Sequence, residues 1–431
     1  MKHIFVFGLD AFNLAELKAL PGAADYRFHP LFHHHEVKAG PEFPVRQLYE
    51  GAIEQLERFP GPIDAIVGYW DFPVSTLLPL LCRHFDLPTP GLETVLKCEH
   101  KYWSRLEQQR VIADHIPPFC VVNPFSERYR EQIGIDYPFW IKPVRAAASH
   151  LGFRVRNDHE LDHAIDVIRA KIFRFAKPFN YLLQFAELPP EIAGIDGFHC
   201  IVEGIISRGR QCTLEGYAYD GEVCIYGAID SIREGRHRSS FSRYQYPSTI
   251  PARVQRRMFD DTGRFLRAIG FDHGPFNIEF YWDSRHDQIR LLEINNRISK
   301  SHCPLFRNVD GLSHHQVMVD LGLGKRPDFP YRRGRYRYAA KFMWRQYEDA
   351  MVKKVPSDKE LAALCRRFPG AQIQLHIHEG MKLSELKDQD SYSYEIAVIF
   401  LGDNNQQKLL QQYARLKQAI PLELVPIASR Q

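Results

Sequence analysis

The pattern of apolar and polar positions divides the chain into regions with different expected structure. In the first 95 residues, short apolar strands expected at 4–7 and 63–69 alternate with helices expected at 48–59 and 75–85. Alternating strands and helices are typical of a parallel sheet whose faces are covered by helices. We therefore expect an α/β domain over residues 1–95, ending near the Pro- and Gly-rich segment 87–91.

The middle of the chain has a different pattern, in which strands outnumber helices. Helices are expected at 93–110, 157–171 and 253–269, and strands at 119–122, 138–143, 181–185, 198–206, 211–219, 222–229, 276–282 and 289–294. Many of these strands are joined by short turns such as Asp220-Gly221, which favours antiparallel pairing. We expect residues 96–330 to form one core with antiparallel sheets.

The last hundred residues repeat neither pattern. Strands are expected at 338–344, 373–378 and 392–401, and helices at 358–367 and 405–418. This predicts a separate α+β domain over residues 331–431. The fold class is thus α/β followed by α+β.

Composition narrows the classes of function. The balance of 45% hydrophobic and 25% charged residues is that of an ordinary globular protein, and the net charge of +4 is too small and too dispersed for a dedicated nucleic-acid binder. No apolar run is long enough for a membrane span or a signal peptide, and none of the eight cysteines form a CxxC pair. We expect a reduced, cytoplasmic protein with no nucleic-acid or membrane partner.

The most informative segment is the pair of strands at 276–282 and 289–294. Glu279 lies on one face of the first strand with Asn277, and Glu293 lies on one face of the second with Asn295. A turn centred on His286 would place the two glutamates opposite each other, within about 4.5–5.5 Å between Cβ atoms. Opposed carboxylates among apolar residues repel unless a cation lies between them. An ordinary hairpin with a solvated acidic face is the alternative, but the pair with Asn295 favours a magnesium site.

Basic residues upstream suit the phosphates that magnesium would carry. Lys142 ends an apolar strand, and Pro143 holds the chain extended there. The small-residue loop 144–152 follows, and such loops let backbone N–H groups approach phosphates. Lys101 lies on the preceding helix. Taken singly, each lysine is as well explained by an ordinary surface position.

In this order, these residues resemble the ATP-grasp superfamily. The resemblance covers residues 1–330: a Rossmann-like domain at 1–95, then a helix lysine, a strand lysine with a small-residue loop, and two acidic strands ending in Glu293-Ile294-Asn295-Asn296-Arg297. Residues 331–431, through the segment 380–392, resemble more weakly the C-terminal domain of the amino-acid ligase branch, which includes carnosine-synthase-like enzymes.

The resemblance implies a role for each matching residue. Glu279, Glu293 and Asn295 would hold Mg²⁺, in two ions for which Mn²⁺ can substitute, and Arg297 and Lys142 would act on the transferring phosphate. A hinge strand at 183–187 would bind adenine through its backbone. The residues implied in ATP binding are Lys101, Lys142, Ser149, Gln184, Ala186, Glu187 and Glu203. Which of Gln184, Glu187 and Glu203 contacts the nucleotide is left open, as is the action of the alanine-rich loop as a lid.

The implied activity is that of a ligase joining a small-molecule carboxylate to an amine, such as amino acids, through an acyl phosphate, with release of ADP and phosphate. The alternatives are a biotin-carboxylase-like carboxylation and a non-catalytic ATP-binding protein. No Met-Lys-Met-like biotin site is encoded in the chain, and the intact acidic pair argues against a non-catalytic protein. The identities of the substrates stay open, and a homodimer is compatible with the resemblance. The histidine run 33–35 is expected in a surface loop, and the basic segment 233–243 is either a solvated loop or a contact for an anionic substrate.

Overall fold

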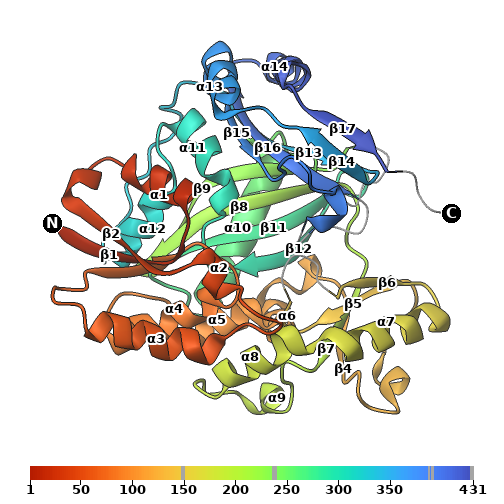
Figure 1. The fold of residues 1–431 in the computed structure, drawn as a ribbon. Coiled ribbons are helices and arrows are strands. Elements are labelled where there is room, and N and C mark those ends of the chain that lie inside the picture. Colours follow the sequence, from red (N-terminus) through yellow and green to blue (C-terminus); the bar gives the residue numbers. More distant parts are fainter. Residues whose placement is uncertain (147–150, 235–239, 387–388, 390–392, 428–431) are drawn as a thin grey trace.

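A computed structural model describes residues 1–146, 151–234, 240–386, 389 and 393–427 (Figure 1). The N-terminal region contains a parallel sheet of three strands in the order β2-β1-β3, as the alternating pattern predicted. Its elements are β1 (Lys2–Leu9), α1 (Ala11–Lys18), β2 (Tyr26–His33), α2 (His34–Val37), α3 (Val45–Glu57), β3 (Ala65–Gly68) and α4 (Val74–His84). Strand β2 was not predicted, because only one of its eight residues is buried and it has no apolar run. The histidines at 33–35 end this strand and begin α2, so the loop expected there was wrong.

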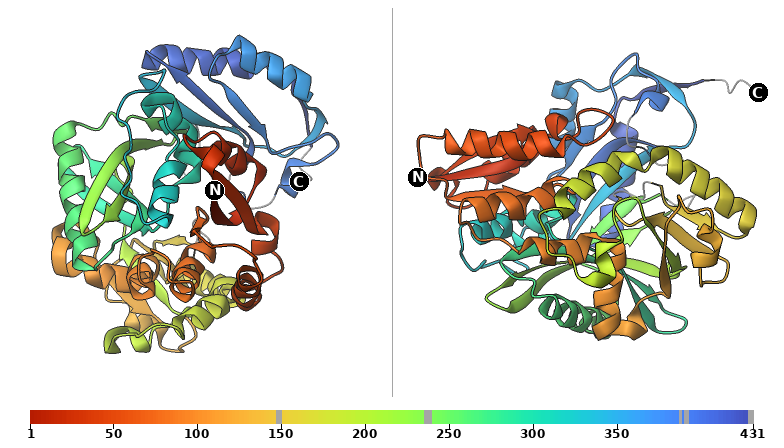
Figure 2. Two further views of the ribbon diagram at one scale, coloured as in Figure 1. Left: turned by 90° about the vertical axis from the view of Figure 1, so that its left-hand side faces the viewer. Right: turned by 90° about the horizontal axis from the view of Figure 1, so that it is seen from below.

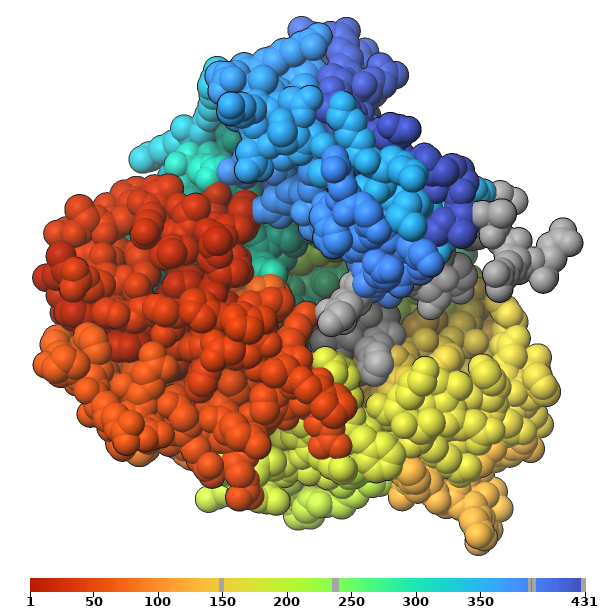
Figure 3. Space-filling model, viewed as in Figure 1, coloured from red at the N-terminus to blue at the C-terminus, as the bar shows by residue number. Residues whose placement is uncertain are grey.

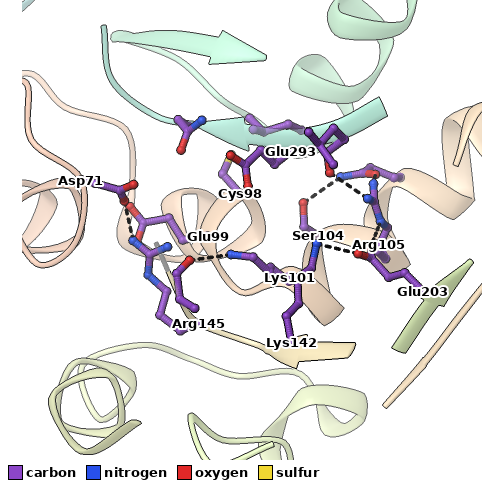
Figure 4. Close-up of a pocket in the computed structure, with 15 residues that line it drawn as sticks. Asp71, Cys98, Glu99, Lys101, Ser104, Arg105, Lys142, Arg145, Glu203 and Glu293 are labelled. Atoms are coloured by element: carbon purple, nitrogen blue, oxygen red, sulfur yellow. Dashed lines mark hydrogen bonds and ion pairs between the residues drawn. The ribbon is translucent and has the colours of Figure 1, made fainter. Parts of the chain in front are cut away.

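The helix predicted over 93–110 is two helices, α5 (Leu92–Glu99) and α6 (Lys101–Ile112). They are separated at His100, whose backbone is extended and whose Nδ1 accepts a hydrogen bond from the backbone N–H of Trp103 at 3.2 Å. This side chain therefore caps α6 in the manner of an N-cap residue. As a result, Lys101 is the first residue of α6, and it lines the pocket drawn in Figure 4.

A four-stranded antiparallel sheet follows, in the order β4-β7-β5-β6. Its elements are β4 (Phe119–Val122), β5 (Phe139–Pro143), β6 (Phe153–Val155), α7 (Asp158–Lys171), α8 (Phe173–Leu183), α9 (Pro190–Ala193) and β7 (Cys200–Gly204). The apolar side of α7, including Leu161 and Ile165, packs on this sheet. The strand predicted at 181–185 was wrong, because these residues end α8 and the turn after it. Phe175, Phe179 and Leu182 of that helix have helical spacing and pack against the N-terminal region.

The centre of the molecule is an eight-stranded antiparallel sheet in the order β12-β11-β8-β9-β10-β13-β16-β15. Its elements and those around it are β8 (Arg210–Tyr219), β9 (Glu222–Ile232), β10 (Arg243–Tyr246), α10 (Ala252–Ala268), β11 (Gly274–Asp283), β12 (Gln288–Asn295), η4 (Lys300–His302), α11 (Cys303–Asp310), α12 (His315–Gly322), β13 (Tyr338–Gln346), β14 (Ala350–Lys354), α13 (Asp358–Arg367), β15 (Gln372–Leu375), β16 (Tyr394–Asp403), α14 (Gln406–Ala419) and β17 (Glu423–Pro426). The sheet is continuous from β10 to β13, so strands before and after residue 331 share hydrogen bonds.

Two further views show how helices cover this sheet. In Figure 2, α13 and α14 lie together over the C-terminal strands, and their side chains Leu364, Leu409 and Leu416 pack into the same apolar core as β13 and β16. The predicted mixture of parallel and antiparallel sheets with an α+β C-terminal region is confirmed. All eight cysteines are free thiols. Within the described residues, no helix has the length and apolar character needed to cross a membrane.

Candidate active site

The acidic hairpin has the predicted register. In the β11–β12 pair, Glu279 lies opposite Glu293 and Asn277 opposite Asn295, and a β-bulge shifts the register only beyond Glu279. Asn295 Nδ2 donates to Asn277 Oδ1 at 2.9 Å. The other face of the hairpin, with Phe280 and Leu291, is fully buried in the core.

The two opposed carboxylates perturb each other. Burial, followed by the charge of Glu293, raises the pKa of Glu279 to about 7. Gln211 Nε2 donates to Glu279 Oε2 at 2.5 Å and offsets part of this effect. Oxygen ligands from two carboxylates and an amide are the set that Mg²⁺ prefers. The donor set of Glu279, Glu293 and Asn295 therefore fits a magnesium ion.

Across a small cavity from β12 lie the predicted lysines (Figure 4). The backbone N–H of Lys101 donates a hydrogen bond to the carbonyl of Val144, and its Nζ donates to the carbonyl of Ala146, each at 2.9 Å. Burial lowers the pKa of Lys101 to about 8, while the charge of Glu293 acts in the opposite direction. The cavity measures about 30 Å³ and its lining includes Lys101, Lys142, Arg105, Arg145, Glu203 and Glu293. The first lysine and the acidic hairpin thus face each other, as required for a metal–phosphate site.

The second lysine belongs to a buried charge cluster. Lys142 Nζ lies 2.6 Å from Glu203 Oε2, and Arg105 Nε lies 2.6 Å from Glu203 Oε1. Burial alone would raise the pKa of Glu203, but the charges of Arg105 and Lys142 outweigh it and hold this pKa below its usual range. Arg105 also donates to the carbonyls of Leu291 and Leu292 in β12, at 3.1 and 2.8 Å. The cluster therefore ties β5 and β7 to the acidic hairpin.

Arg297 is held by a residue that the sequence did not single out. Asp71, after the end of β3, lies 3.2 Å from Arg297 and 2.8 Å from Arg145, and Arg145 is also 3.2 Å from Glu99. Although burial acts in the other direction, Arg297 and Arg145 hold the pKa of Asp71 well below its usual range. Asp71 follows the carboxyl end of a parallel strand, a place where ligand-binding residues of α/β sheets gather. That position was the signal that could have identified it.

The hinge predicted at 183–187 is not at the site. Gln184, Ala186 and Glu187 follow α8 on the side of the N-terminal region, and the backbone N–H of Glu187 donates to Glu93 at 3.1 Å. None of the three lines the small cavity or the larger one described next. A short apolar run does not distinguish a buried strand from a buried helix, which explains the error. Ser149 lies outside the described residues.

A larger cavity, of about 470 Å³, opens beyond the end of β7. It is lined by Gly204, Ile205 and Ile206, which directly follow Glu203, and by Tyr281, two residues after Glu279. Pro117 and Pro118 lie on another side. The segment 204–206 therefore lies between Glu203 of the charge cluster and a cavity lined by both apolar and charged residues, the latter including Arg208, Asp283 and Arg290.

Comparison with known proteins places these residues in context. Residues 135–303 match the model of the ATP-grasp domain. The uncharacterized protein y4rH of Sinorhizobium fredii (strain NBRC 101917 / NGR234) is 24% identical over 329 residues, which is 74% of this chain. The chain spans only 60% of the length of that relative.

Two solved structures share the fold over nearly the whole chain. The L-amino acid ligase from Bacillus licheniformis superposes with a TM-score of 0.73 at 15% identity, covering 98% of both chains. Biotin carboxylase from Campylobacter jejuni superposes with a TM-score of 0.62 at 14% identity, covering 99% of this chain and 92% of the other. Residues 135–303 therefore match an ATP-grasp domain, which confirms the predicted resemblance to the ATP-grasp superfamily for this part of the chain, and the solved structures show the same fold beyond it.

Proposed function

We propose that this protein is an ATP-dependent carboxylate–amine ligase. ATP would phosphorylate a substrate carboxylate, giving an acyl phosphate and ADP, and an amine would then attack the acyl carbon to form an amide and release phosphate. The observation that carries the proposal is that Glu293 and Lys101 line one small cavity, while Glu279 lies opposite Glu293 on the neighbouring strand. Arg297 is held by Asp71 two residues beyond Asn295.

Glu279, Glu293 and Asn295 would hold Mg²⁺ at the ATP phosphates. When bound, magnesium neutralises the charge that develops on the phosphates as the phosphoryl group moves. Two ions are expected from the resemblance to the ATP-grasp superfamily, and Mn²⁺ is expected to substitute because it prefers the same oxygen ligands. The chain contributes position and charge rather than a covalent nucleophile.

Lys101 and Lys142 would bind the phosphates, and Arg297 would face the carboxylate or its acyl phosphate. Lys142 lies against Glu203, so we assign Glu203 to positioning this lysine instead of contacting the nucleotide itself. Adenine would occupy the 470 Å³ cavity, where the backbone of 205–206 and the ring of Tyr281 meet. Ser149 keeps its proposed role at the phosphates.

The division into residues 1–95, 96–330 and 331–431 is also part of this proposal. Each region would supply one wall of the site: Asp71 from the first, the acidic hairpin from the second, and residues of β13 from the third. The substrates would be small molecules. We place the enzyme in the cytoplasm, and a homodimer is part of the proposal. Sites built between domains are where ligand pockets commonly occur.

The test is ADP release from the full chain with Mg²⁺ and a panel of carboxylate–amine pairs, with product masses read in parallel. The proposal expects ADP release that requires both the acid and the amine, and a product mass equal to the sum of the two substrates less one water. ADP release that depends on bicarbonate instead would favour the carboxylase alternative. ATP binding without ADP release from any pair would favour a non-catalytic protein.

A further inference from the structure

Next to the acidic hairpin, the molecule is hollowed on the face shown in Figure 3. The hollow lies between the red N-terminal region and the blue C-terminal region, and teal residues form its floor. Three segments distant in sequence supply two lysines and the aromatic rings beneath them. They are the end of β3, with Trp70, the short helix η4, which begins at Lys300, and the β10–β13 pair, with Tyr244 and Lys341.

Lys300 rests on an aromatic ring rather than on a carboxylate. Its Nζ lies 3.1 Å from the centroid of the Trp70 ring. That ring is fixed because Trp70 Nε1 donates to the carbonyl of Gly8 at 2.7 Å. Gly8 has φ +75, and a Cβ there would lie 2.7 Å from the ring, so only glycine permits this packing. The ring thus holds Lys300 in one place by a cation–π contact.

Asp10 is the carboxylate whose charge acts on Lys300, and its oxygens already accept hydrogen bonds from other residues. Asp10 accepts hydrogen bonds from the backbone and side-chain nitrogens of Asn13, at 2.9 and 2.7 Å, and lies 3.3 Å from the hydroxyl of Tyr69. Within the part of the chain that the structure describes, Lys300 forms no ion pair. Among the described residues, Lys300 therefore has no carboxylate within ion-pair distance, although the charge of Asp10 acts on it.

Lys341 on β13 also lies near an aromatic ring and forms no ion pair with a described residue. It lies opposite Tyr244 in the β10–β13 pair, with its Nζ 5.6 Å from that ring centroid. The neighbouring carboxylate of Glu395 is 3.2 Å from Arg345, which occupies it. The structure records no ion pair for Lys341 with any described residue. The ring of His302 packs edge-on against Tyr244 at 5.1 Å and completes this wall.

The two ammonium groups also act on each other. Burial is the largest cause that lowers the pKa of Lys300, to about 7, and the charge of Asp10 opposes it. The positive charges of Lys341, Lys38 and Arg297 lower this pKa further. Burial lowers the pKa of Lys341 as well. Partly buried cations without a carboxylate at ion-pair distance are costly to fold unless a ligand completes the site. An anion placed between them would gain charge-assisted hydrogen bonds from both.

We propose that Lys300 and Lys341 bind a second anionic group, a carboxylate or a phosphate, on the substrate whose reacting carboxylate lies at Arg297. This inference rests on the proposed ligase function and names its substrate class: the acid is a dicarboxylate or a phosphorylated carboxylate. Lysine suits this role because its ammonium is a compact charge with three donors. Arg297 is spaced three residues before Lys300, so one extended substrate can reach both.

The experiment uses Trp70, which touches Lys300, as its reporter. The full chain is titrated with glutarate, with sulfate as a non-titrating stand-in for phosphate, and with butyrate as a monoanion, while tryptophan fluorescence is recorded. We expect a saturable change with glutarate or sulfate that disappears in Trp70→Phe. Saturation by glutarate identifies a carboxylate and saturation by sulfate a phosphate. Butyrate binding equal to both would overturn the proposal.

Matched variants assign the effect to the two lysines. Lys300→Gln and Lys341→Gln should each raise the half-saturating concentration at least tenfold, whereas Lys353→Gln, which removes the same charge at an exposed position, should not. Thermal unfolding checks that the variants fold, and Lys300→Arg, which keeps the charge, should retain binding. Half-saturation unchanged in both glutamine variants would overturn the inference.

A second readout separates this inference from the ligase function. ADP release is compared for glutamate and glutamine as the acid, which differ only in one side-chain charge. If glutamine supports ADP release as well as glutamate does, in wild type and in the lysine variants, the lysine site is wrong while the ligase function stands. If no acid supports ADP release but anion binding requires the lysines, the site stands and the ligase function is wrong.

Discussion

The molecule holds two pairs of like charges, and they differ in sign and in origin. Glu279 and Glu293 oppose each other on adjacent strands of one hairpin, whereas Lys300 and Lys341 come from a short helix and a distant strand. Each pair is partly buried and leaves an excess of charge. The difference in sign assigns different ligands: the acidic pair suits a metal cation and the lysine pair suits a substrate anion. In each pair the like charges repel, so binding a ligand of the opposite charge is favoured.

The largest effect is expected at the acidic pair. Glu293→Gln keeps the shape and removes one of the two opposed charges, so the fold should survive and magnesium should no longer be held. ATP turnover should fall by about 10³-fold or more, because metal stabilisation of the transferring phosphate contributes several kcal/mol. Steady-state ADP release measures this. Glu348→Gln, an exposed glutamate, is the matched control and should turn over ATP like wild type. Near-normal turnover in a folded Glu293→Gln would refute the site.

A smaller effect is expected on the phosphate side of the acidic pair. Lys142→Ala removes a charge-assisted contact to ATP, worth about 1.5–3 kcal/mol, so ATP affinity should fall about 10- to 100-fold. Arg105 still pairs with Glu203 in this variant, which should therefore stay folded. Calorimetric titration of the variant with Mg-ATP checks the value. An ATP affinity equal to that of wild type would remove Lys142 from the site.

The lysine pair is expected to make anion binding depend on pH. The pKa of Lys300 is lowered to about 7 by burial and by Lys341, Lys38 and Arg297, with Asp10 opposing, so Lys300 loses its proton above that pH in the free protein. Affinity for the anion should then decrease above pH 7 and approach a tenfold loss per pH unit. Lys300→Arg, whose guanidinium stays charged, should flatten the profile measured with glutarate or sulfate. An identical profile in that variant would contradict the account.

The smallest effect concerns the metal-free protein. Because the pKa of Glu279 is raised from about 4.5 when unfolded to about 7 when folded, the folded state binds more protons between these values. Its contribution to the free energy of unfolding is therefore most favourable at low pH and is lost as pH rises to about 7. Urea unfolding without metal measures this: between pH 4.5 and 7, the free energy of unfolding of Glu279→Gln should fall by about 2 kcal/mol less than that of wild type. Parallel pH dependences would show that the pKa of Glu279 is not raised in the folded, metal-free protein.

The contrast between the two pairs also explains how much of the site was predictable. The acidic pair is encoded by a single hairpin, and strand periodicity with one turn position is enough to oppose Glu279 and Glu293. The structure confirms this register, including Asn277 opposite Asn295. Most helices and strands with regular apolar spacing, such as α7 and β16, were predicted for the same reason.

Features that depend on contacts between distant segments were not predictable in this way. Whether residues 181–185 form a strand or a helix depends on packing of α8 against the N-terminal region, which the apolar run itself does not reveal. Lys341 is an ordinary strand residue until β13 pairs with β10, and Lys300 is an ordinary loop residue until Trp70 packs beneath it. Asp71 acquires its role only when Arg297 reaches it from the segment after β12.

The most direct test of the central claim is the position of the metal. Crystals of the full chain grown with Mn²⁺ and a non-hydrolysable ATP analogue would show the metal by its anomalous scattering. The account predicts a peak between the carboxylates of Glu279 and Glu293, with oxygen distances of about 2.0–2.3 Å, bridging to phosphate oxygens on the side of Lys101 and Lys142. A metal peak away from both carboxylates, with the phosphates bound elsewhere, would contradict it.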